Sequence, residues 1–322
     1  MDDVLAALRA GRRIALVSHR DPDPDTIGSA VAVGLALEQL GKTVSYHCAD
    51  PVPESIRFLA RTEQFTTEPP PPDADLMVTV DFGDAARAKF TLPAGVRIVN
   101  IDHHATNAGF GDVGLVDVSS AATGELISRV IDRLGVRWTP EMATAALLAI
   151  MTDTGSFQFP NTDARALDRA ARLRELGADL QAITYNVYRN KRFEALKLVG
   201  IALSRLVRED EGRLVWTWAD HADVVAVGAR EEDMSGLVQQ IARSAGMRLA
   251  LLFSTQSGAV RISCRTSEWP PSVDAAALMA RFGGGGHVRA AGALVVGDPA
   301  EIREGVLAAA RDALAEARLA PA

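Results

Sequence analysis

The sequence predicts an α/β protein: an N-terminal domain with a mainly parallel sheet and helices on both faces, linked by a long helix to a smaller α/β domain. In the first half of the chain, short apolar runs rich in β-branched residues alternate with segments of helical periodicity. This order is typical of parallel sheets, whose crossover connections are helices. In the second half, a long amphipathic segment precedes a new set of strands and helices, which indicates a second domain.

The first domain is expected to alternate buried strands with helices. The expected strands are Arg13–Ser18, Lys42–His47, Leu76–Val80 and Val96–Ile101. The expected helices are Ile27–Leu40, Ser119–Leu134 and Pro140–Thr152. Thr139 is placed to cap the last of these helices and either Asp25 or Thr26 the first, while Gly41 and Gly135 mark helix ends.

The second half begins with the amphipathic segment Asn190–Arg208, which is expected to form one long connecting helix. Strands are expected at Arg213–Trp218, Leu249–Ser254 and Ala259–Cys264, and helices at Met234–Ala245, Val273–Phe282 and Pro299–Ala317. Asp298 is placed to cap the last helix. The predicted domain limits are therefore residues 1–187 and 209–322, with the connecting helix at 188–208.

Composition narrows the class of protein. The chain has 322 residues, of which 48% are hydrophobic and 23% charged, as in ordinary globular proteins. Its net charge of −7 argues against coating long nucleic acid through a broad basic face. The two cysteines, Cys48 and Cys264, exclude a disulfide framework. The longest apolar run, Ala145–Met151, falls short of the ~20 residues of a membrane-spanning helix, and the N-terminus does not resemble a signal peptide, so a cytoplasmic protein is expected.

Histidines and aspartates gather where predicted elements end. The groups are His19 with Asp23 and Asp25, then Asp81, then Asp102, His103 and His104, and finally Asp153. Three of these groups follow strands of the predicted parallel sheet, whose carboxyl ends meet at one edge where ligands bind. We therefore expect these side chains to converge on one site.

Such a site predicts bound metal ions. Converging carboxylates raise one another's pKa unless cations compensate, and the charge of four aspartates matches that of two divalent ions. Imidazole and carboxylate without sulfur suit manganese, iron or cobalt better than calcium or structural zinc. Taken singly, the same residues also fit structural roles: Asp81 as a cap, Asp23 and Asp25 as turn residues, and His103 or His104 as core histidines. Their joint order along the chain favours the metal site.

A second group of residues in the C-terminal half is expected to bind phosphate. Arg265 follows a predicted strand, and a run of four glycines ends at His287. Glycines can adopt positive φ and present backbone N–H groups to an anion, and arginine and histidine add charge-assisted donors. The glycine run alone also fits a flexible loop.

These motifs resemble those of the DHH phosphoesterase superfamily, named for the triplet that stands here at residues 102–104. The resemblance extends from about residue 12 to residue 295, and the family's DHHA1 domain carries a GGGH signature that matches residues 284–287. It implies that residues 1–187 form the DHH catalytic domain and residues 209–322 a substrate-binding DHHA1 domain.

The resemblance also implies a role for each residue. His19 and Asp23 would hold one metal ion and Asp25, His103 and Asp153 the other, with Asp81 bridging two divalent ions, most simply Mn²⁺. Asp102 would orient a metal-bound imidazole, and His104 would face the substrate phosphate and assist the leaving group. The implied catalytic residues are thus Asp81, Asp102 and His104. The implied substrate-binding residues are His104, Arg265, Gly284, Gly285, Gly286 and His287.

Within the superfamily, the layout is most similar to the NrnA-type oligoribonucleases. This implies a Mn²⁺-dependent phosphodiesterase that degrades short oligoribonucleotides and linear dinucleotides to mononucleotides from the 5′ end. It also implies a 3′(2′),5′-bisphosphate nucleotidase acting on 3′-phosphoadenosine 5′-phosphate (pAp). The implied partners are short RNA and nucleotide phosphates, with no long duplex and no membrane, and the implied assembly is a homodimer. Three alternatives stay open: a family II-like inorganic pyrophosphatase, a cyclic dinucleotide phosphodiesterase, and a nucleotide-sensing protein on the same fold.

Overall fold

The computed structural model describes residues 1–93, 95–234, 236–256, 258–267 and 273–319, which form two compact units, Met1–Asn190 and Lys191–Ala322. Each unit contains its own six-stranded sheet. In the described ranges, no helix has both the length and the apolar composition needed to cross a bilayer.

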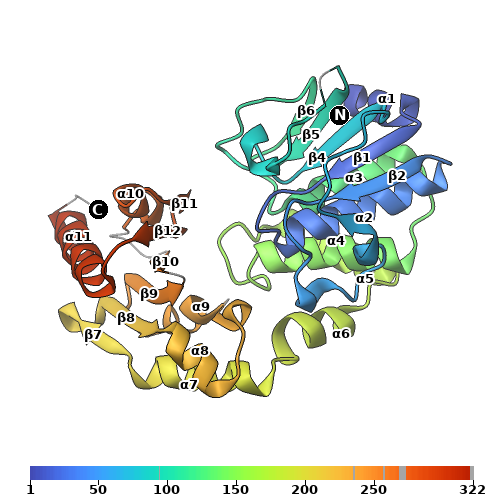
Figure 1. Ribbon diagram of the computed structural model, residues 1–322. Helices are drawn as coiled ribbons and strands as arrows, with labels where there is room; N and C mark the ends of the chain where they lie inside the picture. The colour runs from blue at the N-terminus through green and yellow to red at the C-terminus, as the bar shows by residue number, and fades with distance from the viewer. Residues whose placement is uncertain (94, 235, 257, 268–272, 320–322) are drawn as a thin grey trace. The chain divides into compact units, whose positions relative to one another are not determined.

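The first unit is built on a parallel sheet with the strand order β3-β2-β1-β4-β5-β6 (Figure 1). The strands are β1 (Arg13–Val17), β2 (Thr43–His47), β3 (Phe65–Thr66), β4 (Leu76–Val80), β5 (Arg97–Asp102) and β6 (Val113–Val116). The four predicted strands are confirmed, with ends within one residue of their predicted positions. The chain order reverses between β1 and β4, the switch point where α/β sheets bind ligands beyond their carboxyl ends.

Helices α2 and α3 pack against one face of this sheet, α4 packs on α2 and α3, and these helices share one apolar core with α1 (Figure 1). The helices are α1 (Asp2–Ala10), α2 (Pro24–Gln39), α3 (Thr123–Leu134), α4 (Pro140–Asp153), α5 (Ala164–Glu175) and α6 (Leu180–Ile183), followed by a π-helical turn (Thr184–Arg189). The short 3-10 helices are η1 (Glu54–Ile56), η2 (Thr62–Gln64) and η3 (Ala85–Ala88). The second face of the sheet is covered more thinly, by η3 and the loops around it, where Ala88, Phe90 and Leu92 pack against β1.

Helix α2 begins earlier than predicted because its cap is a different residue. The Asp23 carboxylate, and neither Asp25 nor Thr26, caps α2: its Oδ1 accepts from the backbone N–H groups of both of those residues, each at 3.0 Å. Pro24 then occupies the first helical position, where a missing N–H costs nothing. The other end of the helix is as predicted, with Gly41 at a φ of +73°.

Glycine at position 28 lets α2 and α4 approach closely. A Cβ at Gly28 would lie 2.5 Å from the backbone oxygen of Ala145 on α4. The space that this glycine leaves brings the start of α2, with Asp23 and Asp25, next to the end of α4, with Asp153.

Gly28→Ala is therefore expected to destabilise the first unit. The helix-propensity gain of about 1 kcal/mol is outweighed by an overpacking cost of roughly 1–3 kcal/mol, because the clash is with backbone. Gly200→Ala is the matched control, since no heavy atom of the described residues lies within 4 Å of its added Cβ. It should stabilise its helix by about 0.5–1 kcal/mol. Calorimetric unfolding of both variants measures the difference; equal stabilisation by both would contradict the close-packing argument.

The second unit has a mixed sheet with the order β11-β12-β10-β9-β8-β7, in which β8 and β9 are parallel and the other pairs antiparallel. The strands are β7 (Val207–Glu209), β8 (Leu214–Ala219), β9 (Leu249–Gln256), β10 (Ala259–Thr266), β11 (Gly285–His287) and β12 (Ala290–Val296). The helices are α7 (Phe193–Ser204), α8 (His221–Val227), α9 (Leu237–Ile241), α10 (Ala275–Ala280) and α11 (Pro299–Leu319), with η5 (Asp210–Gly212) and η6 (Glu231–Met234). Helices α10 and α11 share one core with the sheet, and α7, α8 and α9 share another.

The connecting helix is shorter than predicted. Helix α7 covers Phe193–Ser204 rather than residues 190–208, because a π-helical turn precedes it and residues 207–209 leave it to pair with β8. The cap of α11 is as predicted: the Asp298 carboxylate accepts from the N–H groups of Ala300 and Glu301.

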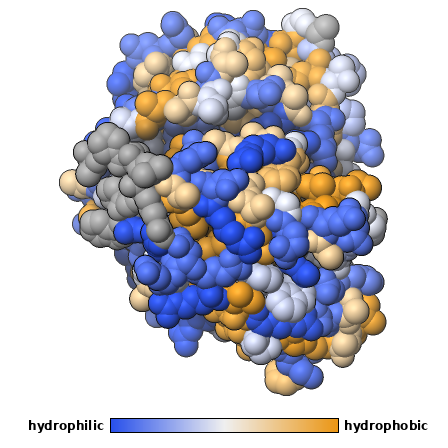
Figure 2. All heavy atoms as spheres, turned by 90° about the vertical axis from the view of Figure 1, so that its left-hand side faces the viewer, coloured by the Kyte–Doolittle hydropathy of each residue, from blue (hydrophilic) through white to orange (hydrophobic). Residues whose placement is uncertain are grey.

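Some large apolar side chains of this unit are exposed. Val225, Leu294 and Val296 are examples. Over the face drawn in Figure 2, hydrophobic and hydrophilic side chains are interspersed.

Candidate metal centre

His19 and Asp23 lie together just beyond the end of β1. Because the Asp23 Oδ1 atom caps α2, its Oδ2 atom remains for the imidazole and lies 3.6 Å from His19 Nε2. The capping bond thus fixes the carboxylate in an orientation that suits a ligand. One residue of the loop serves both the fold and the site.

Asp25, in the first turn of α2, ties this helix to the start of α3. Its carboxylate is buried and accepts hydrogen bonds from the N–H groups of Thr123 (2.8 Å) and Gly124 (2.9 Å) and from the Ser29 hydroxyl (3.1 Å). Its Oδ2 atom also lies 3.9 Å from His103 Nε2. Asp25 is therefore held rigidly with one oxygen toward the second imidazole.

Asp81 stands between the two imidazoles. It follows β4 in a left-handed conformation, with a φ of +69°, which a non-glycine residue rarely adopts. Its Oδ2 lies 3.4 Å from His19 Nε2, and its Oδ1 lies 3.7 Å from His103 Nε2. The Thr123 hydroxyl donates to Oδ1 at 2.9 Å. Each carboxylate oxygen of Asp81 thus faces a different histidine.

Asp153 completes the second group from the end of α4. Its Oδ2 lies 3.3 Å from His103 Nε2. The potential ligand atoms form three overlapping triads: His19, Asp23 and Asp81; Asp25, His103 and Asp153; and Asp81, His103 and His104. Within each triad they lie within 4.8 Å of one another. The structure therefore brings together all six side chains that the sequence predicted as metal ligands.

Backbone carbonyls set the tautomers of the two central histidines. The Nδ1 atom of His19 lies 2.7 Å from the Arg20 carbonyl oxygen, and that of His103 lies 3.2 Å from the Ser120 carbonyl oxygen. Because a carbonyl only accepts, Nδ1 carries the proton in both rings. Each Nε2, which faces the carboxylates, is then the atom able to bind a metal ion.

Asp102 has a different partner from the predicted one. Its Oδ1 accepts from Nδ1 of His104 at 2.7 Å, whereas the His103 ring is held by the Ser120 carbonyl. Asp102 therefore orients the imidazole of His104 and not that of His103. The two rings lie next to each other, with their centroids 4.6 Å apart, but only the ring of His104 bonds to the Asp102 carboxylate. The amide of Asn107 donates to the other oxygen of Asp102 at 2.6 Å.

The buried negative charge of this cluster is typical of a site that binds cations. Burial raises the pKa of Asp81 and of Asp153 well above the usual range, and the charges of neighbouring aspartates raise both further. Burial alone would lower the pKa of His19, but hydrogen bonds and charge from Asp23 and Asp81 raise it to about 10. The cluster thus holds a surplus of buried negative charge, which protons partly neutralise when no metal is bound. Its imidazole and carboxylate donors fit divalent transition-metal ions.

Several further residues of the site were not predicted. Thr123 binds both Asp25 and Asp81, Ser120 orients His103, and Asn107 holds Asp102. Asn100 extends this network, because its Oδ1 accepts from Asn107 at 2.8 Å. They act through hydrogen bonds that only the folded chain makes possible, and no sequence spacing predicts them.

The predicted phosphate-binding residues lie in the second unit. Arg265 is on β10, half-buried. The last two residues of the glycine run are not in a loop, because residues 285–287 form the edge strand β11. Glycine is required there: a Cβ at Gly284 would lie 2.2 Å from the Gly292 oxygen. An edge strand still presents unpaired backbone N–H groups on its outer side. The side chain of His287 lies outside the described part of the chain.

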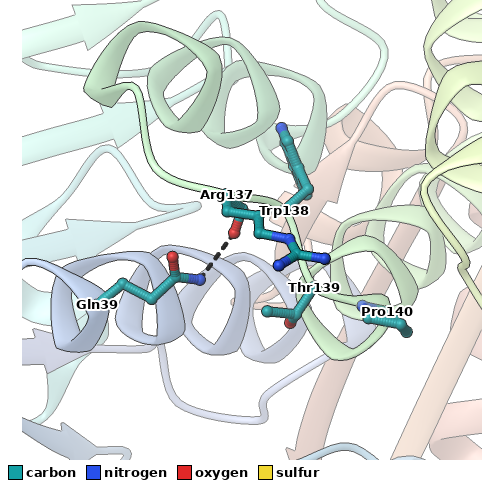
Figure 3. A pocket seen from close by; sticks show the side chains of 5 residues that line it. All are labelled: Gln39, Arg137, Trp138, Thr139 and Pro140. Atoms are coloured by element: carbon teal, nitrogen blue, oxygen red, sulfur yellow. Dashed lines mark hydrogen bonds between the residues drawn. The ribbon is translucent and has the colours of Figure 1, made fainter.

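A shallow pocket of about 330 Å³ lies elsewhere in the first unit (Figure 3). Gln39 at the end of α2 reaches across it to the Arg137 carbonyl, 2.8 Å away, with Trp138, Thr139 and Pro140 on the other side (Figure 3). At a rise of 1.5 Å per residue, α2 separates this pocket from the metal ligands by about 20 Å. It is not part of the candidate site.

Fold and donor set together define a class: enzymes that hold divalent cations on His and Asp side chains at the carboxyl edge of an α/β sheet. Within this class, the chain belongs to the DHH family of phosphoesterases. The model of the DHH family N-terminal domain matches residues 13–150, and that of the DHHA1 domain matches residues 221–316.

Relatives and solved structures agree with this assignment. The chain is 37% identical to the bifunctional oligoribonuclease and PAP phosphatase NrnA of Thermus thermophilus, over 94% of this chain and 91% of the relative. An exopolyphosphatase-related protein from Bacteroides fragilis has the same fold, with a TM-score of 0.88 at 22% identity over 98% of this chain and 95% of that one. RecJ from Thermus thermophilus, crystallised in complex with Mn²⁺, shares the fold at a TM-score of 0.56 and 19% identity, over 99% of this chain and 54% of that one.

Binding of Mn²⁺ is expected to release protons and to tighten as the pH rises. His19, whose pKa is raised to about 10 in the metal-free protein, carries a proton near neutral pH that a metal ion must displace from Nε2. Calorimetric titration in two buffers of different ionisation enthalpy measures this release. A binding enthalpy that does not depend on the buffer would show that the metal ion does not displace a proton from His19.

Proposed function

We propose that this chain hydrolyses short oligoribonucleotides and linear dinucleotides to mononucleotides, from the 5′ end, and removes the 3′-phosphate of pAp. The observation that carries the proposal is the set of three overlapping His and Asp triads, with Asp81 between the imidazoles of His19 and His103. The substrate class comes from the likeness to the NrnA relative, which extends over nearly the whole of both chains.

The proposed cofactors are two divalent ions, Mn²⁺ in the first place. His19 and Asp23 would hold one ion, and Asp25, His103 and Asp153 the other, with one oxygen of Asp81 on each side. When bound, the ions supply Lewis acidity that offsets charge on the phosphoryl oxygens and lowers the pKa of a water molecule. Two ions are supported because each imidazole has its own carboxylate neighbour: His19 lies next to Asp23, and His103 lies next to Asp153.

The remaining residues are proposed to act on the substrate. His104, with its Nδ1 proton held by Asp102, faces the phosphate and assists departure of the leaving group. Arg265, the glycines at 284–286 and His287 bind phosphate groups, which makes the second unit the substrate-binding domain and residues 1–187 the catalytic one. The net charge of −7 fits this role, because a few phosphates need only a local positive site. A homodimer belongs to the same proposal and is tested by light scattering.

The test is product analysis with Mn²⁺. RNAs of two to five nucleotides, labelled at either end, should yield mononucleotides, with the 5′ label released first. Unlabelled pAp should compete and lose phosphate. Turnover of pyrophosphate or of a cyclic dinucleotide without RNA products would overturn the proposal in favour of those alternatives, and binding without any turnover would favour a sensor.

A further inference from the structure

The guanidinium of Arg265 is held by neutral acceptors. Its Nη1 atom donates to the Cys264 carbonyl oxygen at 2.8 Å. Its Nη2 atom donates to the side-chain oxygen of Gln239 on α9 at 3.0 Å, in the amide orientation that satisfies both of that amide's partners. Among the described residues, no ion pair joins Arg265 to a carboxylate. Burial lowers the pKa of this group, a sign that its charge is incompletely compensated.

Several other arginines of the same unit bind carboxylates instead. Arg205 binds both oxygens of Asp223, and Arg311 binds both oxygens of Glu209. Arg192 and Arg213 also pair with aspartates. These pairs fulfil structural roles with their charge neutralised. A half-buried guanidinium that is positioned but left without an anion is suited to receive one from a ligand.

The orientation of Gln239 is itself determined by the backbone. Its amide nitrogen donates to the Gly236 carbonyl oxygen at 3.0 Å. Because that carbonyl only accepts, the nitrogen must face it, and the oxygen is then directed at Arg265. A glutamate in this place would turn an oxygen toward the Gly236 carbonyl and a full negative charge toward the guanidinium.

We propose that Gln239 is a positioning residue that fixes the Arg265 guanidinium and keeps its positive charge available for a phosphate group of the substrate. The inference rests on the proposed function, in which Arg265 binds phosphate. Glutamine suits this role because it supplies a hydrogen-bond acceptor without the charge that would compete with the phosphate.

Gln239→Glu and Gln239→Ala separate this role from a merely structural one. The glutamate variant strengthens the tether but neutralises the arginine, so KM for pAp should rise about 10- to 100-fold, the range for a lost charge-assisted bond. The alanine variant loosens the tether but keeps the charge, so its KM should rise less, and kcat should change little in either variant. Gln240→Glu is the matched control: it makes the same charge change on the neighbouring residue of α9, which faces Arg243, and should behave as the unmodified chain.

The rank order of the KM values among these variants tests the proposed role of Gln239. A glutamate variant close to the unmodified chain, with alanine the worse of the two, would show that Gln239 only tethers Arg265 and would overturn the proposal, as would equal KM values in all variants. Mn²⁺ affinity and thermal unfolding, measured alongside, should be unchanged, because the metal ligands lie in the other unit. If the unmodified chain proves inactive on RNA and pAp but hydrolyses pyrophosphate, the proposed function fails. The same rank order in KM for pyrophosphate then still tests Gln239.

Discussion

Asp81→Asn is expected to lower kcat more than about 1000-fold while the chain still folds, because several kcal/mol of charge stabilisation disappear with one carboxylate. The two oxygens of Asp81 face the two imidazoles at 3.4 and 3.7 Å, so this side chain lies within reach of both proposed ions. Asparagine has the same size and can keep the bond from the Thr123 hydroxyl, but it removes the negative charge. The loss should therefore appear in turnover and in metal binding together.

The stability of the variant provides an independent test. Burial and the neighbouring aspartates raise the pKa of Asp81, so its ionised form costs free energy in the metal-free fold. Chelated Asp81→Asn protein should unfold at the same temperature as the unmodified chain or higher, and it should gain less from added Mn²⁺. Asp84→Asn is the matched control, because Asp84 is exposed and caps η3, a role asparagine fulfils equally well. Turnover by Asp81→Asn near that of the control would disprove the bridging position.

Much of the first unit could be predicted because its central strands, β1, β4 and β5, are largely buried. Leu76–Val80 is apolar or β-branched throughout and is fully buried, so its pattern leaves little ambiguity. The strands β3 and β6 escaped prediction because one has two residues and the other alternates between half-buried and exposed positions. The metal-facing residues could be predicted because they are reactive side chains at element ends, where a parallel sheet must bring them together.

The predictions that the structure corrects have a common cause: they depend on contacts that the spacing of residues in the sequence does not reveal. Whether Asp102 would orient the first or the second imidazole of its triplet depends on how the chain turns after β5, and that turn is held by Asn107. Residues 285–287 form a strand because they pair with β12, which also passes close enough to leave no room for a Cβ at Gly284. Both outcomes depend on tertiary neighbours, which composition and periodicity do not reveal.

Asp102→Asn is expected to lower kcat by up to about 10⁴-fold, the loss seen when a carboxylate that holds a catalytic imidazole becomes an amide. Four donors point at Asp102: the N–H groups of His103 and His104, Nδ1 of His104, and the Asn107 amide. An asparagine offers one accepting oxygen and turns a donor toward the remaining partners. Whichever way the new amide faces, either His104 or Asn107 loses its acceptor.

This loss should leave the metal ions in place, because the His103 ring is held independently by the Ser120 carbonyl at 3.2 Å. Mn²⁺ affinity is therefore expected to be unchanged while kcat falls, whereas both are expected to fall in Asp81→Asn. Asn107→Ala is the control: it removes the partner of the second oxygen but keeps the bond to His104, so its kcat should fall far less. A metal affinity that falls in parallel with kcat in Asp102→Asn would show instead that Asp102 acts through the metal-facing imidazole, since only the His104 route separates turnover from metal binding.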